Sequence, residues 1–261
     1  MKNVKKLSNK EPTKDISRDD LKSKIPLSTS KKKRIVKISK NLSFGGDKLP
    51  IIAGPNGVES EKLMINIAKQ LKKNDIHIIR GHAYKPLTFP YRSKQYSESR
   101  DKGMDIMDEI KKDFGLLVVT EVTELRFLER INKTADILQI GSRNMQNLEL
   151  IKKIASTQKP IILKRHFGSS IRDLLGAAEH ILRSTSRFAL DIQAIPALKE
   201  ISCLPVISDP SHASFWAPWV PSLTYASIAA GCDGLIIEIH PNPKKSFVDP
   251  LQPLNFNQFK K

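Results

Sequence analysis

The chain has 261 residues, enough for one large core, and its 44 Lys and Arg against 27 Asp and Glu give a net charge of +17. This charge suits phosphorylated metabolites, nucleic acid or an acidic surface about equally well. Because it has neither a run of about 18 apolar residues nor a signal peptide, we expect a soluble cytoplasmic protein without a membrane partner. Cys203 and Cys232 lie far apart, which excludes a CxxC zinc site and a disulfide framework.

The first 34 residues are rich in lysine, contain few periodic apolar residues and end in "KKKR". This composition predicts a basic disordered tail over residues 1–34, followed by one folded domain over residues 35–261. The tail either keeps the protein in solution or acts as an electrostatic arm for a partner. Nucleic acid is the less favoured partner, because no aromatic stacking platform or base-reading motif accompanies the charge.

Apolar runs alternate with amphipathic helical stretches along the rest of the chain. We predict strands at residues 49–55, 76–83, 115–122, 136–141, 160–166, 204–212 and 234–241. Continuous apolar strands that alternate with helices indicate a parallel sheet covered by helices, an α/β fold. For this length a (β/α)8 TIM barrel is favoured, with a doubly wound open sheet as the second choice.

The predicted barrel is one strand short. Between the helical stretches near residues 170–184 and 190–201, only "STSRFA" is available, which is too short for two loops and a buried strand. We therefore expect the barrel to be incomplete or distorted at its sixth strand.

Each predicted strand ends in polar residues, and in a parallel barrel these ends share one face. In chain order they are Asn56; Arg80, His82 and Lys85; Glu121; Arg143 and Asn144; Lys164, Arg165 and His166; Asp209, Ser211 and His212; Glu238 and His240; and then Asp249. Charges at buried strand ends require partners. The cations bind either an anionic ligand with a phosphate and a carboxylate, or the acids Glu121, Glu238 and Asp209.

Three of these residues have the side chains of a metal site. His212, Glu238 and Asp249 offer one imidazole and two carboxylates, which suit divalent Mn, Fe or Zn. Their spacing is long and loose, so the pattern alone also fits a histidine and a glutamate that simply hydrogen-bond each other.

Several stretches taken together are more specific. "IIAGPNGVES", "RGHAYKPLTFPY", "DILQIGSRNMQNLELI", "LPVISDPSHA" and "AAGCDGLIIEIHPNP" follow one another in order from about residue 35 to about residue 256. This series resembles 3-deoxy-7-phosphoheptulonate (DAHP) synthases of the short, type I beta kind, which belong with the 3-deoxy-octulosonate 8-phosphate synthases. "KPLTFPY" and "GSRNMQN" favour the heptulonate branch.

The resemblance implies a TIM barrel that joins phosphoenolpyruvate to erythrose 4-phosphate, a transferase at the entry of the shikimate pathway of aromatic amino acid biosynthesis. It implies that phosphoenolpyruvate is bound by Arg80, Lys85, Arg143 and Lys164, and the sugar phosphate by Thr88. Lys85 would also handle a proton, and the implied catalytic residues are Lys85, His212 and Asn56. The family metal would be held by His212, Glu238 and Asp249, and the relatives are homo-oligomers.

The chain departs from the family pattern at four places. Asn56 replaces the cysteine that would be the fourth metal ligand, so metal affinity is weakened or lost. Leu87 stands where an arginine would bind the sugar phosphate, and the strand with a further phosphate-binding arginine falls in the gap after Ser184. Trp216 and Trp219 occupy a loop that is polar and basic in the family. The two tryptophans form a lid or a contact surface, or they simply pack against the barrel.

These departures leave three interpretations open. The first is an active DAHP synthase, with or without a metal. The second is a catalytically inactive relative, a pseudoenzyme that keeps the anion site or serves as a protein-interaction module. The third is an activity like that of 3-deoxy-octulosonate 8-phosphate synthase, which uses arabinose 5-phosphate as its aldose.

Overall fold

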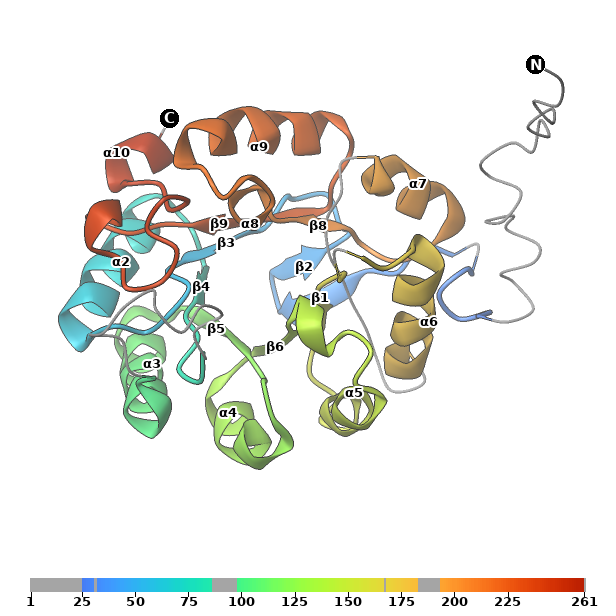
Figure 1. Ribbon diagram of the computed structural model, residues 1–261, viewed down its shortest axis with the longest axis horizontal. Coiled ribbons are helices and arrows are strands. Elements are labelled where there is room, and N and C mark those ends of the chain that lie inside the picture. Colours follow the sequence, from blue (N-terminus) through green and yellow to red (C-terminus); the bar gives the residue numbers. More distant parts are fainter. Residues whose placement is uncertain (1–24, 31, 86–97, 167, 183–192, 261) are drawn as a thin grey trace, which may run out of the picture.

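The computed structural model describes residues 25–30, 32–85, 98–166, 168–182 and 193–260. Seven parallel strands form one sheet that curls into an incomplete barrel with helices around its outside (Figure 1). The strands are β3 (Ile51–Gly54), β4 (Ile78–Arg80), β5 (Leu117–Glu121), β6 (Ile137–Ile140), β7 (Ile161–Leu163), β8 (Ile207–Ser208) and β9 (Gly234–Glu238). This architecture confirms the predicted TIM-barrel class.

The sheet is incomplete between β7 and β8. Its strand order is β7-β6-β5-β4-β3-β9-β8, so these two strands are the edges, and within the described residues no strand pairs with both of them. The gap falls where the sequence predicted a missing or truncated sixth strand. The "STSRFA" segment itself lies outside the described residues.

The helices follow the strands in the usual alternation of an α/β barrel. They are α2 (Glu61–Lys73), α3 (Arg100–Phe114), α4 (Leu128–Thr134), α5 (Leu148–Ala155), α6 (Ile171–Leu182), α7 (Ala194–Ile201), α8 (Pro210–Ser214), α9 (Val220–Ala229) and α10 (Phe256–Phe259). Local signals explain their ends: Ser60 caps α2 by accepting a hydrogen bond from the amide of Leu63 at 3.3 Å, and Lys72 and Lys73 face the negative end of its dipole. None of the described helices is both long and apolar enough to span a bilayer.

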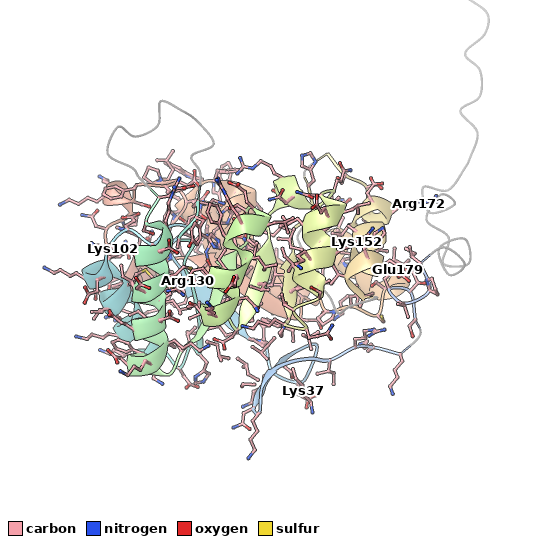
Figure 2. The ribbon with its side chains drawn as sticks, turned by 90° about the horizontal axis from the view of Figure 1, so that it is seen from below. Lys37, Lys102, Arg130, Lys152, Arg172 and Glu179 are labelled. Carbon is pink, nitrogen blue, oxygen red and sulfur yellow. The ribbon has the colours of Figure 1, made fainter. Side chains whose placement is uncertain are left out.

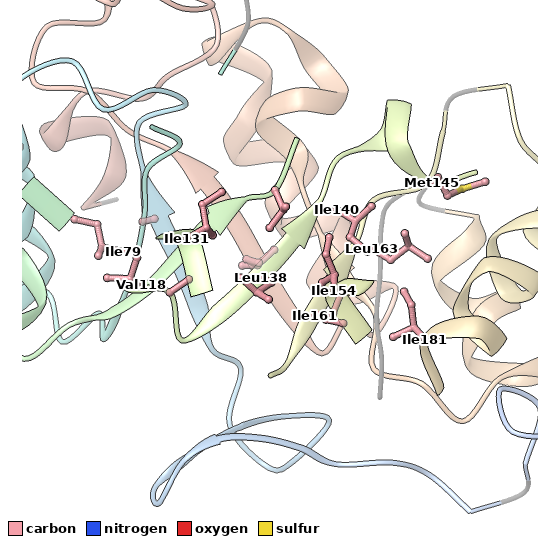
Figure 3. Close-up of a cluster of buried hydrophobic side chains, with 14 of the residues drawn as sticks. Ile79, Val118, Ile131, Leu138, Ile140, Met145, Ile154, Ile161, Leu163 and Ile181 are labelled. Atoms are coloured by element: carbon pink, nitrogen blue, oxygen red, sulfur yellow. The ribbon is translucent and has the colours of Figure 1, made fainter. Parts of the chain in front are cut away.

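Two hydrophobic layers hold the barrel together. Outside the sheet, Ile79, Val118 and Leu138 point toward the helices, which contribute residues such as Ile131 and Ile154 (Figure 3). Inside the sheet, each strand provides one buried apolar residue: Ile52, Ile78, Val119, Ile137, Ile162, Ile207 and Ile236. Because side chains alternate between the faces of a strand, the continuous apolar runs of the sequence supply both layers at once.

A hairpin closes the amino-terminal end of the barrel. It consists of β1 (Val36–Ser39) and β2 (Leu42–Phe44), and it projects from one end of the molecule with Lys37 pointing outward (Figure 2). Phe44 belongs to the inner apolar cluster, and its ring would lie only 2.6 Å from a Cβ at position 234. Only glycine therefore fits at Gly234, because any larger residue would collide with the ring that fills this end.

The segment before the hairpin is packed against the barrel. Both carboxylate oxygens of Glu179 on α6 accept hydrogen bonds from it, from the amides of Leu27 at 3.0 Å and Ser28 at 2.9 Å. The carbonyl of Ser28 accepts hydrogen bonds from the hydroxyl of Ser202 at 2.8 Å and the amide of Cys203 at 3.0 Å. Residues 25–30 thus lie against the barrel, whereas residues 1–24 of the predicted tail lie outside the described residues.

Candidate active site

The polar groups of the site form a layer directly above the inner apolar layer. Arg80, Glu121, Gln139, Lys164, Asp209 and Glu238 each lie two positions after the inner apolar residue of the same strand, and on β3 this position is Gly54, which has no side chain. Because the side-chain period of a strand is two, these side chains enter the barrel on the same side, one step nearer its carboxyl end. We call this set, with the residues that contact it, the polar layer.

Asn56 lies between a buried cation and a carboxylate. Its side-chain oxygen accepts a hydrogen bond from Arg80 Nη2 at 2.8 Å, and its side-chain nitrogen donates to Asp249 Oδ2 at 3.1 Å. Arg80 also donates from Nε to the carbonyl of Pro55 at 3.2 Å and is almost completely buried. An amide suits this position because it can accept from the guanidinium and donate to the carboxylate at the same time.

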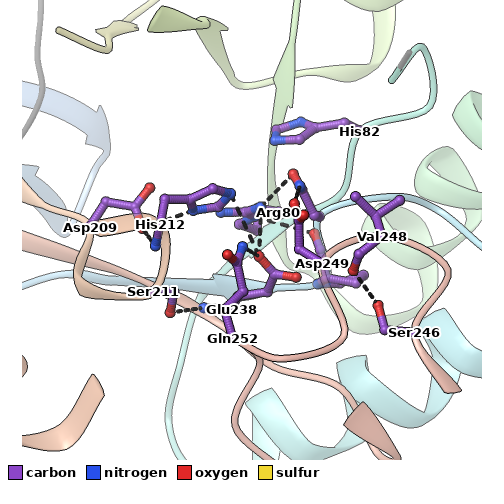
Figure 4. Close-up of polar contacts among 12 residues, drawn as sticks. Arg80, His82, Asp209, Ser211, His212, Glu238, Ser246, Val248, Asp249 and Gln252 are labelled. Carbon is purple, nitrogen blue, oxygen red and sulfur yellow. Dashed lines mark hydrogen bonds and ion pairs between the residues drawn. The ribbon is translucent and has the colours of Figure 1, made fainter. Parts of the chain in front are cut away.

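Glu238 is the most buried acid of the site and has three polar neighbours (Figure 4). Its Oε2 accepts a hydrogen bond from Gln252 Nε2 at 2.6 Å and lies 3.6 Å from His212 Nε2 and 3.7 Å from Arg80 Nη2. Burial raises the pKa of Glu238 to about 7, although the Arg80 guanidinium acts in the opposite direction. Within the described residues, Glu238 Oε1 and Arg80 Nη1 are buried without a hydrogen-bond partner.

His212 connects Glu238 to a second acid, Asp209. Its Nδ1 lies 3.0 Å from Asp209 Oδ1, and Lys164 Nζ forms an ion pair with Asp209 Oδ2. Burial alone would raise the pKa of Asp209, but His212 and Lys164 outweigh it and hold that pKa well below its usual range. Burial lowers the pKa of His212 to about 4, so at neutral pH its Nδ1–H donates to the Asp209 carboxylate.

On the other side of the site, Lys85 pairs with Glu121. Lys85 Nζ lies 2.8 Å from Glu121 Oε2, and a Cβ at position 141 would lie 1.9 Å from Glu121 Oε1, so Gly141 is required for the close approach. Burial would raise the pKa of Glu121, but Lys85, Lys164 and Arg143 together lower it. Arg143 is exposed at the rim, within the 3-10 turn Ser142–Asn144 after β6.

His82 follows β4 two positions after Arg80 and lies near Arg80 and Lys85. Its Nδ1 accepts a hydrogen bond from the amide of Glu121 at 2.9 Å, and its Nε2 lies 3.5 Å from Gln139 Nε2. Burial lowers the pKa of His82 well below its usual value, and Arg80 and Lys85 lower it further. His82 is therefore neutral, with its proton on Nε2, where it can donate to Gln139 once that amide is turned over.

The structure brings together nearly all of the predicted site residues. Asn56, Arg80, His212, Glu238 and Asp249 form one connected group, and Lys85, Arg143 and Lys164 surround Glu121 and Asp209 beside it. Lys85, Lys164 and Arg80 each lie beside an acid, as the ion-pair interpretation of these cations expected. Thr88 and Leu87 lie outside the described residues.

Sequence reasoning missed one residue and gave no role to another. Gln252 donates to Glu238, and the only signal for it was its place three residues after Asp249. Glu59 holds the segment that carries Asp249, since its Oε1 accepts from the amide of Phe247 at 2.9 Å and its Oε2 lies 3.4 Å from His240 Nε2.

The residues present do not fit the metal that the resemblance implies. Among the described residues, no group of three His, Cys, Asp or Glu side chains is arranged to hold an ion. Of the three predicted ligands, His212 and Glu238 are neighbours, but Asp249 is held by the Asn56 amide. The Arg80 guanidinium supplies the positive charge beside Glu238. Cys203 and Cys232 are buried and free, and Cys203 packs against the amino-terminal segment.

Fold and site together define a class: TIM-barrel proteins whose strand ends enclose a highly charged polar site. Residues 25–261 match the model of the DAHP synthetase I family. The chain is 36% identical over 237 residues to a phospho-2-dehydro-3-deoxyheptonate aldolase from Thermotoga maritima, covering 84% of this chain and 69% of the relative. The chain belongs to the DAHP synthetase I family.

Solved structures and a second group of relatives agree with this assignment. The crystal structure of a T. maritima phospho-2-dehydro-3-deoxyheptonate aldolase (DAHP synthase) has a TM-score of 0.82 at 33% identity, covering 88% of this chain and 70% of that one. A truncated form of 3-deoxy-D-arabino-heptulosonate 7-phosphate synthase from T. maritima gives 0.81 at 32% identity, covering 90% and 92%. A 2-dehydro-3-deoxyphosphooctonate aldolase from Syntrophotalea carbinolica is 25% identical over 254 residues, covering 85% and 91%.

Proposed function

We propose that this chain condenses phosphoenolpyruvate with erythrose 4-phosphate, releasing inorganic phosphate. The observation that carries the proposal is the convergence of Arg80 on β4, Lys85 after β4 and Lys164 after β7 on one buried layer, while Arg143 after β6 lies at its rim. Carboxylate and phosphate groups on one small molecule are recognised by such a set of guanidinium and ammonium groups. The free thiols are those of a reducing compartment, and we place the reaction in the cytoplasm.

Binding must compete with the internal ion pairs. Lys164 and Lys85 are held by Asp209 and Glu121, so an incoming anion has to share or replace these carboxylates. The internal pairs keep the cations in place before the substrate arrives, which lowers the entropic cost of ordering them during binding.

The chemistry joins C3 of phosphoenolpyruvate to the aldehyde carbon of the sugar. The aldehyde oxygen takes up a proton, water adds at C2, and the C2–O bond to phosphate breaks. We assign the proton donation to Lys85, whose ammonium group is held beside Glu121 at 2.8 Å. Arg80, Arg143 and Lys164 would neutralise the charge of the substrate and of the departing phosphate.

We assign no step to a metal ion, because the Asn56 amide replaces the cysteine ligand that the resemblance implies and the Arg80 guanidinium supplies the positive charge beside Glu238. Turnover is therefore expected to be the same with and without a chelator. Asn56 would act by positioning Arg80 and Asp249, which it joins by hydrogen bonds.

The test incubates the protein with phosphoenolpyruvate and erythrose 4-phosphate, with and without chelator, and follows phosphate release. Lys85→Met is expected to slow release by roughly 10²- to 10⁴-fold, the usual loss of a general acid. Lys111→Met is the matched control, because Lys111 pairs with Asp136 at 2.7 Å away from the site, and it should keep the wild-type rate. If neither erythrose 4-phosphate nor arabinose 5-phosphate supports turnover, the proposed enzymatic activity is excluded and the interpretation as an inactive relative is favoured.

A second candidate activity is supported by the octulosonate relatives, which match at 25% to 26% identity. It uses the same phosphoenolpyruvate site with arabinose 5-phosphate as the aldose. Running the assay with each aldose in turn separates the two candidates, because our proposal expects the larger kcat/KM with erythrose 4-phosphate.

A further inference from the structure

A cavity of about 500 Å³ lies at the amino-terminal end of the barrel. Ser30 and residues 32–37 of the segment that leads into the hairpin line one wall, and residues 158–160 between α5 and β7 line the other. We call it the basic cavity. Figure 2 shows the first wall at the lower edge of the molecule, where it joins the hairpin that carries Lys37. The lining includes the last three residues of "KKKR", a motif that lies outside the candidate active site.

The basic cavity is separate from the candidate active site. Pro160 in its lining comes directly before β7, whereas Lys164 of the polar layer comes directly after this strand. At about 3.3 Å per residue of a strand, the two residues are roughly 13 Å apart. No lining residue of the cavity belongs to the polar layer, so a ligand bound here would not occupy the substrate site.

The lining of the basic cavity is strongly positive. Half of its ten residues are cations, namely Lys32, Lys33, Arg34, Lys37 and Lys159, and none is Asp or Glu. Within the described part of the chain, no carboxylate forms an ion pair with any of the first four. The cations Arg80, Lys85 and Lys164 of the active site differ, because each lies beside an acid. Cations that surround a hollow without acids focus a positive potential there, which attracts anions.

Hydrogen bonds hold both walls in place. The amide of Arg34 donates to the carbonyl of Cys203 at 2.8 Å, which fixes the first wall against the barrel. In the second wall, Lys159 Nζ donates to the carbonyl of Ala135 at 2.6 Å. The cations are therefore attached to backbone that the fold itself holds, which lowers the entropic cost of binding a ligand.

Size and charge select the ligand. Sites for small molecules usually have volumes of about 300 to 1,000 Å³, and this cavity lies within that range. One phosphate group carries at most about two negative charges, which is fewer than the five positive charges of the lining. Single-stranded nucleic acid is bound by stacking its bases on aromatic rings, and none of the lining residues is aromatic. We propose that the basic cavity binds a small molecule that carries two or more linked phosphate groups.

Calorimetric titration with inorganic pyrophosphate tests the proposal. The wild type should bind pyrophosphate in the basic cavity more tightly than it binds inorganic phosphate. The double variant Lys33→Met with Arg34→Met should weaken pyrophosphate binding by roughly tenfold, because two charged contacts near the surface are lost. Lys72→Met with Lys73→Met is the matched control, since it removes two exposed charges from the last turn of α2, outside the cavity, and should bind as wild type does.

A further variant separates the basic cavity from the active site, whose cations also attract phosphates. Lys164→Met should leave pyrophosphate binding in the cavity unchanged. Circular dichroism and the thermal midpoint establish that every variant is folded. The proposal is overturned if the wild type does not bind pyrophosphate, if Lys164→Met abolishes the binding, or if both double variants weaken it equally. Tighter binding of a single-stranded oligonucleotide, weakened by Lys33→Met with Arg34→Met, would overturn it in favour of nucleic acid.

Discussion

At the residue scale, the site depends on the period of two along a strand. Ile78 and Arg80 enter the barrel from the same side of β4, as do Ile236 and Glu238 on β9, so the polar layer could be predicted once the strands were identified. The hydrogen bonds within the polar layer could not be predicted from the sequence. That Asn56 joins Arg80 to Asp249 depends on where the loop after β9 returns, and no local pattern encodes that return.

The buried pair of Arg80 and Glu238 gives the first prediction. Arg80→Met leaves a completely buried carboxylate without its cation and should lower the free energy of unfolding by roughly 3 to 5 kcal/mol in urea titrations. Adding Glu238→Gln should recover part of that loss, because the uncompensated charge is removed. Arg126→Met breaks a surface pair with Glu124 and should cost less than about 1 kcal/mol. Equal losses in the single and double variants would contradict this explanation.

His82 gives a prediction about pH. Its pKa is well below 6.5 in the folded protein and close to 6.5 in the unfolded chain, so below pH 6.5 only the unfolded chain binds this proton. Stability should therefore fall as the pH drops below 6.5. His82→Asn keeps an acceptor for the amide of Glu121 and removes the titration, so its urea midpoint should fall less steeply with pH than that of wild type. If the urea midpoints of the two proteins fall equally steeply with pH, His82 does not contribute to the pH dependence of stability.

At the element scale, the amino-terminal segment shows what composition could not predict. Residues 25–30 follow a lysine-rich stretch that reads as solvated tail, yet Glu179, an ordinary acid in a helical pattern, holds them. The contact joins residues about 150 positions apart, beyond the reach of any local signal. The strands and helices themselves were predictable, since their apolar periodicity is local.

Glu179→Gln tests this contact. The side-chain amide of glutamine keeps one acceptor oxygen and replaces the other with an NH2 group, which would face the backbone amide of Leu27 or Ser28, itself a donor, at a cost of about 1 to 3 kcal/mol. Hydrogen exchange at these two amides should become faster. Asp173→Asn on the same helix, which loses only contacts to Ser170, is the control and should leave them protected. Unchanged protection in Glu179→Gln would mean that the segment is held by other contacts.

At the scale of the whole molecule, side chains bridge the open part of the barrel at its carboxyl end. Lys164 follows β7 and Asp209 follows β8, the two edges of the sheet, and these residues form an ion pair across the gap. The shortness of the segment between α6 and α7 predicted the gap from the sequence. The ion pair between Lys164 and Asp209 could not be predicted, because it depends on how far the sheet curls. The same lysine therefore links the two edges of the sheet and belongs to the proposed substrate site.

The central claim is that these strand-end cations form one site for phosphoenolpyruvate, and calorimetric titration tests it most directly. Phosphoenolpyruvate should bind the wild type at a single site. Lys164→Met should weaken binding by roughly 10- to 100-fold, the loss expected for one charge-assisted contact. Lys199→Met removes a comparable pair with Asp233 outside the site and should bind as wild type does. No binding heat from the folded wild-type protein, or equal affinity in Lys164→Met, would contradict the account.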